Sequence, residues 1–126
     1  MKKHLITFFL LLCLTIVYAQ EKAELVFQKE TIELGKIHTE KEHDEIITNF
    51  VFYNKGNKPL VIYKVTAACG CTIPSWPKTP IKVGEKSTIK VVFKTKGQKG
   101  VFSKKLFVES NSQSPIKLLK IKGEIK

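Results

Sequence analysis

An all-β fold, in the form of a single antiparallel β-sandwich, is the fold class that this 126-residue sequence predicts. Three observations lead to it. Beyond the first segment, apolar side chains recur with a period of about two and not of about 3.6, as in strands with one face on a core. Turn sequences rich in Gly, Asn and Pro separate the apolar runs at intervals of roughly 8 to 15 residues. No stretch of about ten or more residues carries a convincing helical face.

The first 19 residues are predicted to form a cleavable signal peptide. Two lysines precede an apolar run, Leu5–Val17, and V-Y-A fits cleavage after Ala19. The run is shorter than the roughly 20 residues of a transmembrane helix. Cys13 lies inside it and lacks the small preceding residue of a lipoprotein signal. We therefore expect an exported protein, periplasmic, cell-surface or secreted, whose mature chain, residues 20–126, forms one domain without an integral membrane span.

About seven short strands account for most of the mature chain. In the strand near residue 90, Ile89, Val91 and Phe93 share one face and lysines the other, so this strand is expected to be half-buried. The connections N-K-G-N-K-P, T-K-G-Q-K-G and S-N-S-Q-S-P have turn chemistry. In chain order, the expected strands are one or two short ones within 24–37, interrupted at Gly35, and longer ones at 46–53, 60–67, 89–95, 101–110 and 116–125.

One connection, residues 72–86, is expected to be an ordered crossover loop and not a strand of the ladder. It holds three prolines around Trp76 and shows no alternation, and V-G-E-K near its end indicates a turn. Trp76 is a candidate partner contact, because an exposed indole is a frequent anchor in interfaces. The alternative is a lid over one end of the core, which the flanking prolines favour.

Charge is distributed unevenly along the mature chain. Residues 20–45 hold 4 lysines and 8 acidic residues, net −4, whereas residues 46–126 hold 16 lysines and 3 acidic residues, net +13. Such a balance attracts anionic surfaces. Export and the lack of arginine argue against nucleic acid. The expected partner is an unknown protein or an anionic envelope component; alternatively, the lysines only form the solvent face of strands and protect sheet edges.

Cys69 and Cys71 flank Gly70 directly after a strand, and a disulfide between them is one open role. Two extended steps span roughly 6.6 to 7.2 Å, at or beyond the usual separation of about 4.4 to 6.8 Å, so the bond needs a bend. Gly70 is a candidate to supply it, because glycine can take backbone angles forbidden to other residues. Export permits the bond, but so small a loop would contribute little to folding and would be easily reduced. Thiol exchange is therefore a second role.

A metal site is a third role, since two thiolates on one face are half of a zinc or copper site. The only histidines that could complete it are His38 and His43. The remaining alternative is structural, with small thiols packed where bulkier side chains would not fit. No cofactor is expected. The chain shows no nucleophile elbow, phosphate-cradling loop or two-histidine metalloprotease motif, so we expect no enzyme.

The run from Phe50 to Asn111 resembles the bacterial family called domain of unknown function 1573. The elements that carry the resemblance are N-K-G-N-K-P-L, C-G-C-T, W-P-K-T-P-I-K-V-G-E, G-V-F-S-K and V-E-S-N, in that order. It implies an immunoglobulin-like sandwich, similar to domains of pilus chaperones, sperm proteins and cilia-associated repeats, in an exported protein often found in Bacteroidetes. It implies no activity and no catalytic residue. Ala68 stands where the family usually has serine.

Together these features predict an exported, non-catalytic binding or structural module of the cell envelope. The alternative is a thiol redox or metal-binding protein that uses the Cys69-Gly70-Cys71 sequence.

Overall fold

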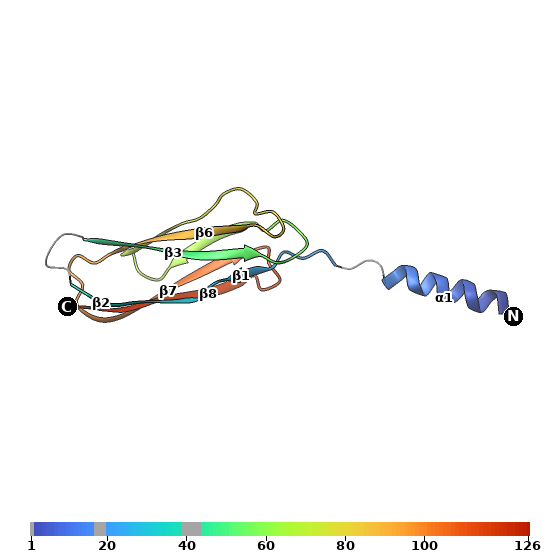
Figure 1. Ribbon diagram of the computed structural model, residues 1–126, viewed down its shortest axis with the longest axis horizontal. Coiled ribbons are helices and arrows are strands. Elements are labelled where there is room, and N and C mark those ends of the chain that lie inside the picture. The colour runs from blue at the N-terminus through green and yellow to red at the C-terminus, as the bar shows by residue number, and fades with distance from the viewer. Residues whose placement is uncertain (1, 17–19, 39–43) are drawn as a thin grey trace.

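Two four-stranded sheets packed face to face form the body of the molecule (Figure 1). The computed structural model describes residues 2–16, 20–38 and 44–126. Helix α1 (Lys2–Ile16) precedes the sandwich and lies within the predicted signal peptide. Over the described residues, no helix combines the length and the apolar character that crossing a bilayer requires.

The first sheet has the strand order β1-β3-β6-β5, and the second has β2-β8-β7-β4. The predicted all-β sandwich is therefore confirmed, with eight strands where about seven were expected. In chain order the strands are β1 (Leu25–Phe27), β2 (Thr31–Ile37), β3 (Glu45–Asn54), β4 (Ile62–Ala67), β5 (Thr72–Ser75), β6 (Lys86–Lys94), β7 (Gly100–Ser110) and β8 (Ile116–Ile125).

The strands β1 and β2 follow one another in different sheets (Figure 1). Residues 28–30 carry the chain across without reversing it, so β2 pairs in parallel with β8, whereas the other strand pairs are antiparallel. The expectation of a purely antiparallel sandwich was wrong at this one pair. Within β2 the register shifts between Glu33 and Lys36, and Gly35 has a φ of 70°. Gly35 therefore bulges the strand and does not end it.

The core lies between the two sheets, where the period-two pattern placed it. Phe27 packs against Phe50 and Phe52 with ring centroids 6.4 and 5.7 Å apart. Phe93 of β6 meets Phe102 of β7 at 4.8 Å and joins the two layers. Burying each such ring is worth about 1.5 to 3 kcal/mol. The buried apolar residues are Ala23, Leu25, Phe27, Phe50, Phe52, Leu60, Ile62, Val65, Ile81, Ile89, Val91, Phe93, Phe102, Leu106, Val108, Leu119, Ile121 and Ile125.

The segment 72–86 contains a strand that its sequence did not reveal. β5 pairs with β6 in antiparallel register, with Pro74 opposite Val91. The prediction of a loop was wrong here because β5 is the edge of its sheet, where a proline can sit without breaking a ladder on its outer side. Between β5 and β6 the chain forms only a single bridge, Leu60 with Ile81, and the predicted turn follows at Gly84, whose φ is 81°.

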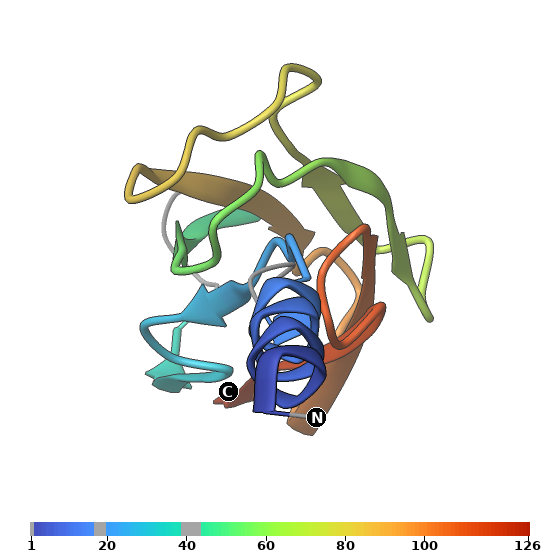
Figure 2. The ribbon, with the colours of Figure 1, turned by 90° about the vertical axis from the view of Figure 1, so that its right-hand side faces the viewer.

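Figure 2 views the sandwich from the side of α1 and shows the loops of one end gathered toward the viewer. This end carries the connections 55–61, 76–85 and 111–115. The opposite end carries the corner between β4 and β5 and the turn between β6 and β7. We call these the amide end and the disulfide end, for the groups that close them.

Candidate functional site

The C-G-C sequence forms the corner at which the chain leaves the second sheet and enters the first. β4 and β5, the strands on either side of it, are edge strands of the two sheets. Cys69 and Cys71 are joined by a disulfide, and their Cα atoms lie 5.2 Å apart. That separation is shorter than two extended steps, which span roughly 6.6 to 7.2 Å, so the chain bends here as the bond requires.

Gly70 does not make this bend in the predicted way. Its φ lies outside the left-handed region, unlike that of Gly35 or Gly84. Open space surrounds the position where a Cβ would stand on Gly70. A left-handed backbone at Gly70 is therefore not what closes the corner. The closing contacts are the disulfide and the Thr72 N–H, which donates to the Cys69 carbonyl at 3.1 Å.

The two half-buried sulfurs have different surroundings. Cys71 packs against the hydrophobic core, and its Sγ lies 3.8 Å from the Thr72 hydroxyl. Cys69 does not belong to the residues that pack on the core, and its Sγ accepts a hydrogen bond from the Cys71 N–H at 3.2 Å. The Cys69 sulfur, which is not packed on the core, is thus the one that accepts a main-chain hydrogen bond.

Two lysine-bearing strands flank the corner. The Lys94 N–H of β6 donates to the Cys71 carbonyl at 2.8 Å, and the Ala68 N–H donates to the Lys105 carbonyl of β7 at 3.2 Å. These main-chain bonds tie the corner to β6 of the first sheet and β7 of the second.

The alternative metal site is not assembled among the described residues. His38 is exposed just beyond the end of β2, and His43 lies outside the described residues. Disulfide sulfurs are not thiolates, which are the form that ligates zinc or copper. Within residues 2–16, 20–38 and 44–126, no group of three or more His, Cys, Asp or Glu side chains could hold a metal ion.

The contacts of Trp76 are those of a side chain that covers part of the core. Trp76 is half-buried and packs against the hydrophobic core. The Lys78 Nζ sits over its ring, 3.2 Å from the centroid, in a cation–π contact. These contacts fit the lid, and the role of Trp76 as a partner contact stays a prediction.

The outer face of the second sheet brings apolar and cationic side chains together. In the register of β7 and β8, Phe107 lies opposite Leu118, and the next outward pair is Lys105 opposite Lys120. Phe107 and Leu118 are 41% and 38% exposed, and Ile116 beside them is 60% exposed. We call these five residues the lysine-apolar face.

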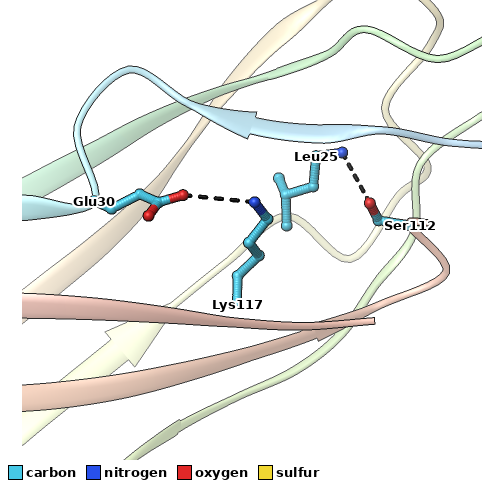
Figure 3. Close-up of polar contacts among 4 residues, drawn as sticks. All are labelled: Leu25, Glu30, Ser112 and Lys117. Atoms are coloured by element: carbon cyan, nitrogen blue, oxygen red, sulfur yellow. Dashed lines mark hydrogen bonds and ion pairs between the residues drawn. The ribbon is translucent and has the colours of Figure 1, made fainter. Parts of the chain in front are cut away.

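Other lysines on the same sheet face stand opposite glutamates. The pairs are Lys64 with Glu109, Glu33 with Lys122 and Lys36 with Glu124. At Lys105 and Lys120, by contrast, like charges oppose each other, which costs stability in a sheet. The salt bridge found over the described residues, Lys117 with Glu30 at 3.5 Å, involves neither of them (Figure 3).

A network of side-chain amide hydrogen bonds closes the amide end, and the sequence alone did not reveal it. Asn54 is fully buried. Its Oδ1 accepts hydrogen bonds from the N–H groups of Gly56 and Glu24 at 3.0 and 3.3 Å. Its Nδ2 donates to the carbonyls of Lys58 and Ile81 at 2.8 and 3.1 Å. A single side chain thus satisfies four main-chain groups from three segments.

The V-E-S-N-S segment extends this network from the second sheet. The Asn111 Oδ1 accepts from the Val61 N–H at 2.8 Å, and its Nδ2 donates to the Pro59 carbonyl at 3.1 Å. The buried Ser112 Oγ accepts from the Leu25 N–H at 3.0 Å (Figure 3). The sequence signal that could have predicted this network is the asparagine next to each turn, because an asparagine side chain often forms hydrogen bonds with nearby main-chain groups.

The N-terminal strands β1 and β2 belong to different sheets. Two sheets in this strand order define an immunoglobulin-like, PapD-like sandwich domain. The chain belongs to the family described as protein of unknown function DUF1573, whose model matches residues 25–125. The resemblance carried by the sequence motifs is therefore confirmed. No curated protein matches the chain.

Solved structures share the fold. A protein of unknown function from Porphyromonas gingivalis W83 is 17% identical, with a TM-score of 0.72. The match covers 87% of this chain and 50% of that one, so the chain spans half the length of that protein. PapD-like domain 7 of human CEP192 is 8% identical, with a TM-score of 0.64 and coverage of 87% and 90%. The periplasmic chaperone SfaE is 9% identical, with a TM-score of 0.52 and coverage of 81% and 57%.

Proposed function

We propose that this chain is an exported module of the cell envelope that binds an anionic lipid surface through the lysine-apolar face and has no catalytic role in doing so. The observation that carries the proposal is the Lys105–Lys120 pair beside the exposed Phe107–Leu118 pair. Both features lower the stability of the isolated domain, because like charges repel across a sheet and because apolar surface is exposed to water.

An anionic lipid layer relieves both costs. Its phosphates turn the repulsion between Lys105 and Lys120 into attraction, and each lysine near such a surface contributes about 1 kcal/mol. The apolar side chains of the same face gain a less polar boundary to pack against. The net charge of +13 over residues 46–126 adds a long-range attraction.

The proposal that the chain is exported is supported by its first residues and by the cysteine pair. The two lysines, the apolar run and the V-Y-A sequence are the parts of a signal peptide. A disulfide between Cys69 and Cys71 suits an oxidising compartment outside the cytosol.

Vesicle sedimentation tests whether the chain binds an anionic lipid surface. The purified chain should sediment with vesicles that contain phosphatidylglycerol and stay in solution with pure phosphatidylcholine. Binding should weaken steeply as salt rises, because exposed charges are screened. Lys105→Gln with Lys120→Gln should weaken binding at least about tenfold, because two ammonium groups no longer reach the lipid phosphates.

The matched control is Lys86→Gln with Lys90→Gln, which removes the same charge from exposed positions of β6 in the other sheet. This variant should keep binding within about twofold, because only the long-range field changes. Equal losses in the two double variants would contradict the assigned face. Failure of the unaltered chain to sediment at low salt would exclude a lipid surface as the partner.

A further inference from the structure

We infer that the Cys69–Cys71 disulfide is a thiol–disulfide exchange site, in which Cys69 forms the mixed disulfide with an incoming thiol and Cys71 is the resolving cysteine. The site lies at the corner between β4 and β5. It goes beyond the proposed lipid binding and rests on the disulfide and its main-chain contacts.

The bond contributes little as a staple for the fold. Its sequence separation is only 2, and in the chain-entropy model the stabilisation by a disulfide is smallest for the shortest loops. The corner has other support, because the Thr72 N–H bonds to the Cys69 carbonyl and the Lys94 N–H bonds to the Cys71 carbonyl. Opening the disulfide therefore leaves the two flanking strands held in place.

The surroundings of the sulfurs assign the two roles. Cys71 packs on the core, so an incoming thiol meets the Cys69 sulfur first. When exchange releases Cys69 as a thiolate, the Cys71 N–H at 3.2 Å is already placed to stabilise the negative charge.

The exchange balances with two external thiols as the reductant. A first thiolate, RS⁻, attacks the Cys69 Sγ; the Sγ–Sγ bond breaks, and the Cys71 Sγ leaves with the electron pair and takes a proton. A second thiolate attacks the R sulfur of the mixed disulfide, and the Cys69 Sγ leaves as a thiolate. The external thiols lose two electrons and two protons and become RSSR, while the cysteine pair gains both and, once the Cys69 thiolate is protonated, becomes a dithiol. The reverse sequence oxidises the pair.

Glutathione is the probe for the test, and the full chain carries Cys13→Ser so that only Cys69 and Cys71 react. The oxidised chain is equilibrated with mixtures of reduced and oxidised glutathione, quenched with acid, labelled with a maleimide and weighed by mass spectrometry. The fraction of dithiol should rise as the share of reduced glutathione rises. A pair that stays oxidised in a large excess of reduced glutathione, with the circular dichroism unchanged, would overturn the inference.

Single variants test the assignment of roles. With oxidised glutathione, Cys71→Ser should form its adduct on Cys69 at least about tenfold faster than Cys69→Ser forms one on Cys71, because accessibility and thiolate stabilisation favour Cys69. Equal rates, or the opposite order, would refute it. Circular dichroism shows whether each variant is folded, and the unaltered pair in the glutathione equilibrium gives a reading that needs no substitution.

Discussion

The two ends of the sandwich are closed by different chemistry. At the amide end, Asn54, Asn111 and Ser112 satisfy main-chain groups from several segments, and Asn54 is fully buried. At the disulfide end, a half-buried bond between Cys69 and Cys71 closes a corner that open space surrounds at Gly70. Both ends belong to the family motifs, but Asn54 bonds to main chain from three segments, whereas of the two cysteines Cys71 packs on the core and Cys69 does not.

This difference separates residues that hold the fold from residues that are free for chemistry. A buried amide with four partners cannot change state without leaving main-chain groups unpaired. A disulfide at a sheet edge can open while the neighbouring hydrogen bonds stay in place. The free energy of unfolding should therefore respond strongly to substitutions at the amide end and weakly at the disulfide end.

Asn54→Asp should have the largest effect. The carboxylate keeps an acceptor where Oδ1 lies but turns a second oxygen toward the carbonyls of Lys58 and Ile81, which accept hydrogen bonds from Nδ2. A buried charge facing two acceptors should lower the free energy of unfolding by about 4 kcal/mol, as measured by chemical denaturation. Asn49→Asp, the same change at an exposed position of β3, should be nearly neutral.

Gly56→Ala should come next. A Cβ on Gly56 would collide with the Lys22 carbonyl oxygen and the main chain of Ala23 and Glu24, so the backbone must move. That movement disturbs the bond from the Gly56 N–H to Asn54, and we expect a loss of about 3 kcal/mol. A melting temperature equal to that of the unaltered chain would show that this close approach is not needed.

Removal of the disulfide should have a smaller effect. Cys69→Ser with Cys71→Ser should lower the free energy of unfolding by about 1.5 kcal/mol or less, because the loop that it closes is so short. Denaturation under non-reducing conditions gives the value. A loss as large as that of Asn54→Asp would place the corner among the supports of the fold and end the contrast between the two ends.

Gly70→Ala should have the smallest effect. The position is exposed, its φ is not in the left-handed region and open space lies where the new Cβ would stand, so the change should stay within about 0.5 kcal/mol. Thermal unfolding beside Gly56→Ala compares the same substitution at the two ends. Similar losses for both glycines would contradict the contrast.

The sequence predicted the fold well wherever one strand face is buried. Alternation placed Ile89, Val91 and Phe93 in the core and located the strand at 116–125. It did not predict β5, because a four-residue edge strand containing Pro74 shows too little alternation to be recognised. The parallel pairing of β2 with β8 also escaped, since it depends on which sheet the chain enters after residue 30 and not on any local pattern.

The candidate site was predictable only in part. The sequence marked Cys69 and Cys71 as a pair, but the difference between their sulfurs depends on which one meets the core. The Lys105–Lys120 pair depends on the register of two strands, which the separate strand patterns do not set. The partners of Asn54 lie in three segments, so its role follows only from the assembled loops.

The parallel pairing of β2 with β8 has a mechanical consequence. The chain enters β2 from the amide end and leaves β8 at the disulfide end, and the bonds from Lys120 to Glu30 and from Lys126 to Ile37 lie near the limits of the shared ladder. A pull that draws the two ends of the domain apart loads this ladder in shear, so its hydrogen bonds resist together and do not unzip one by one. Under tension along its long axis, the sandwich should act as a stiff link.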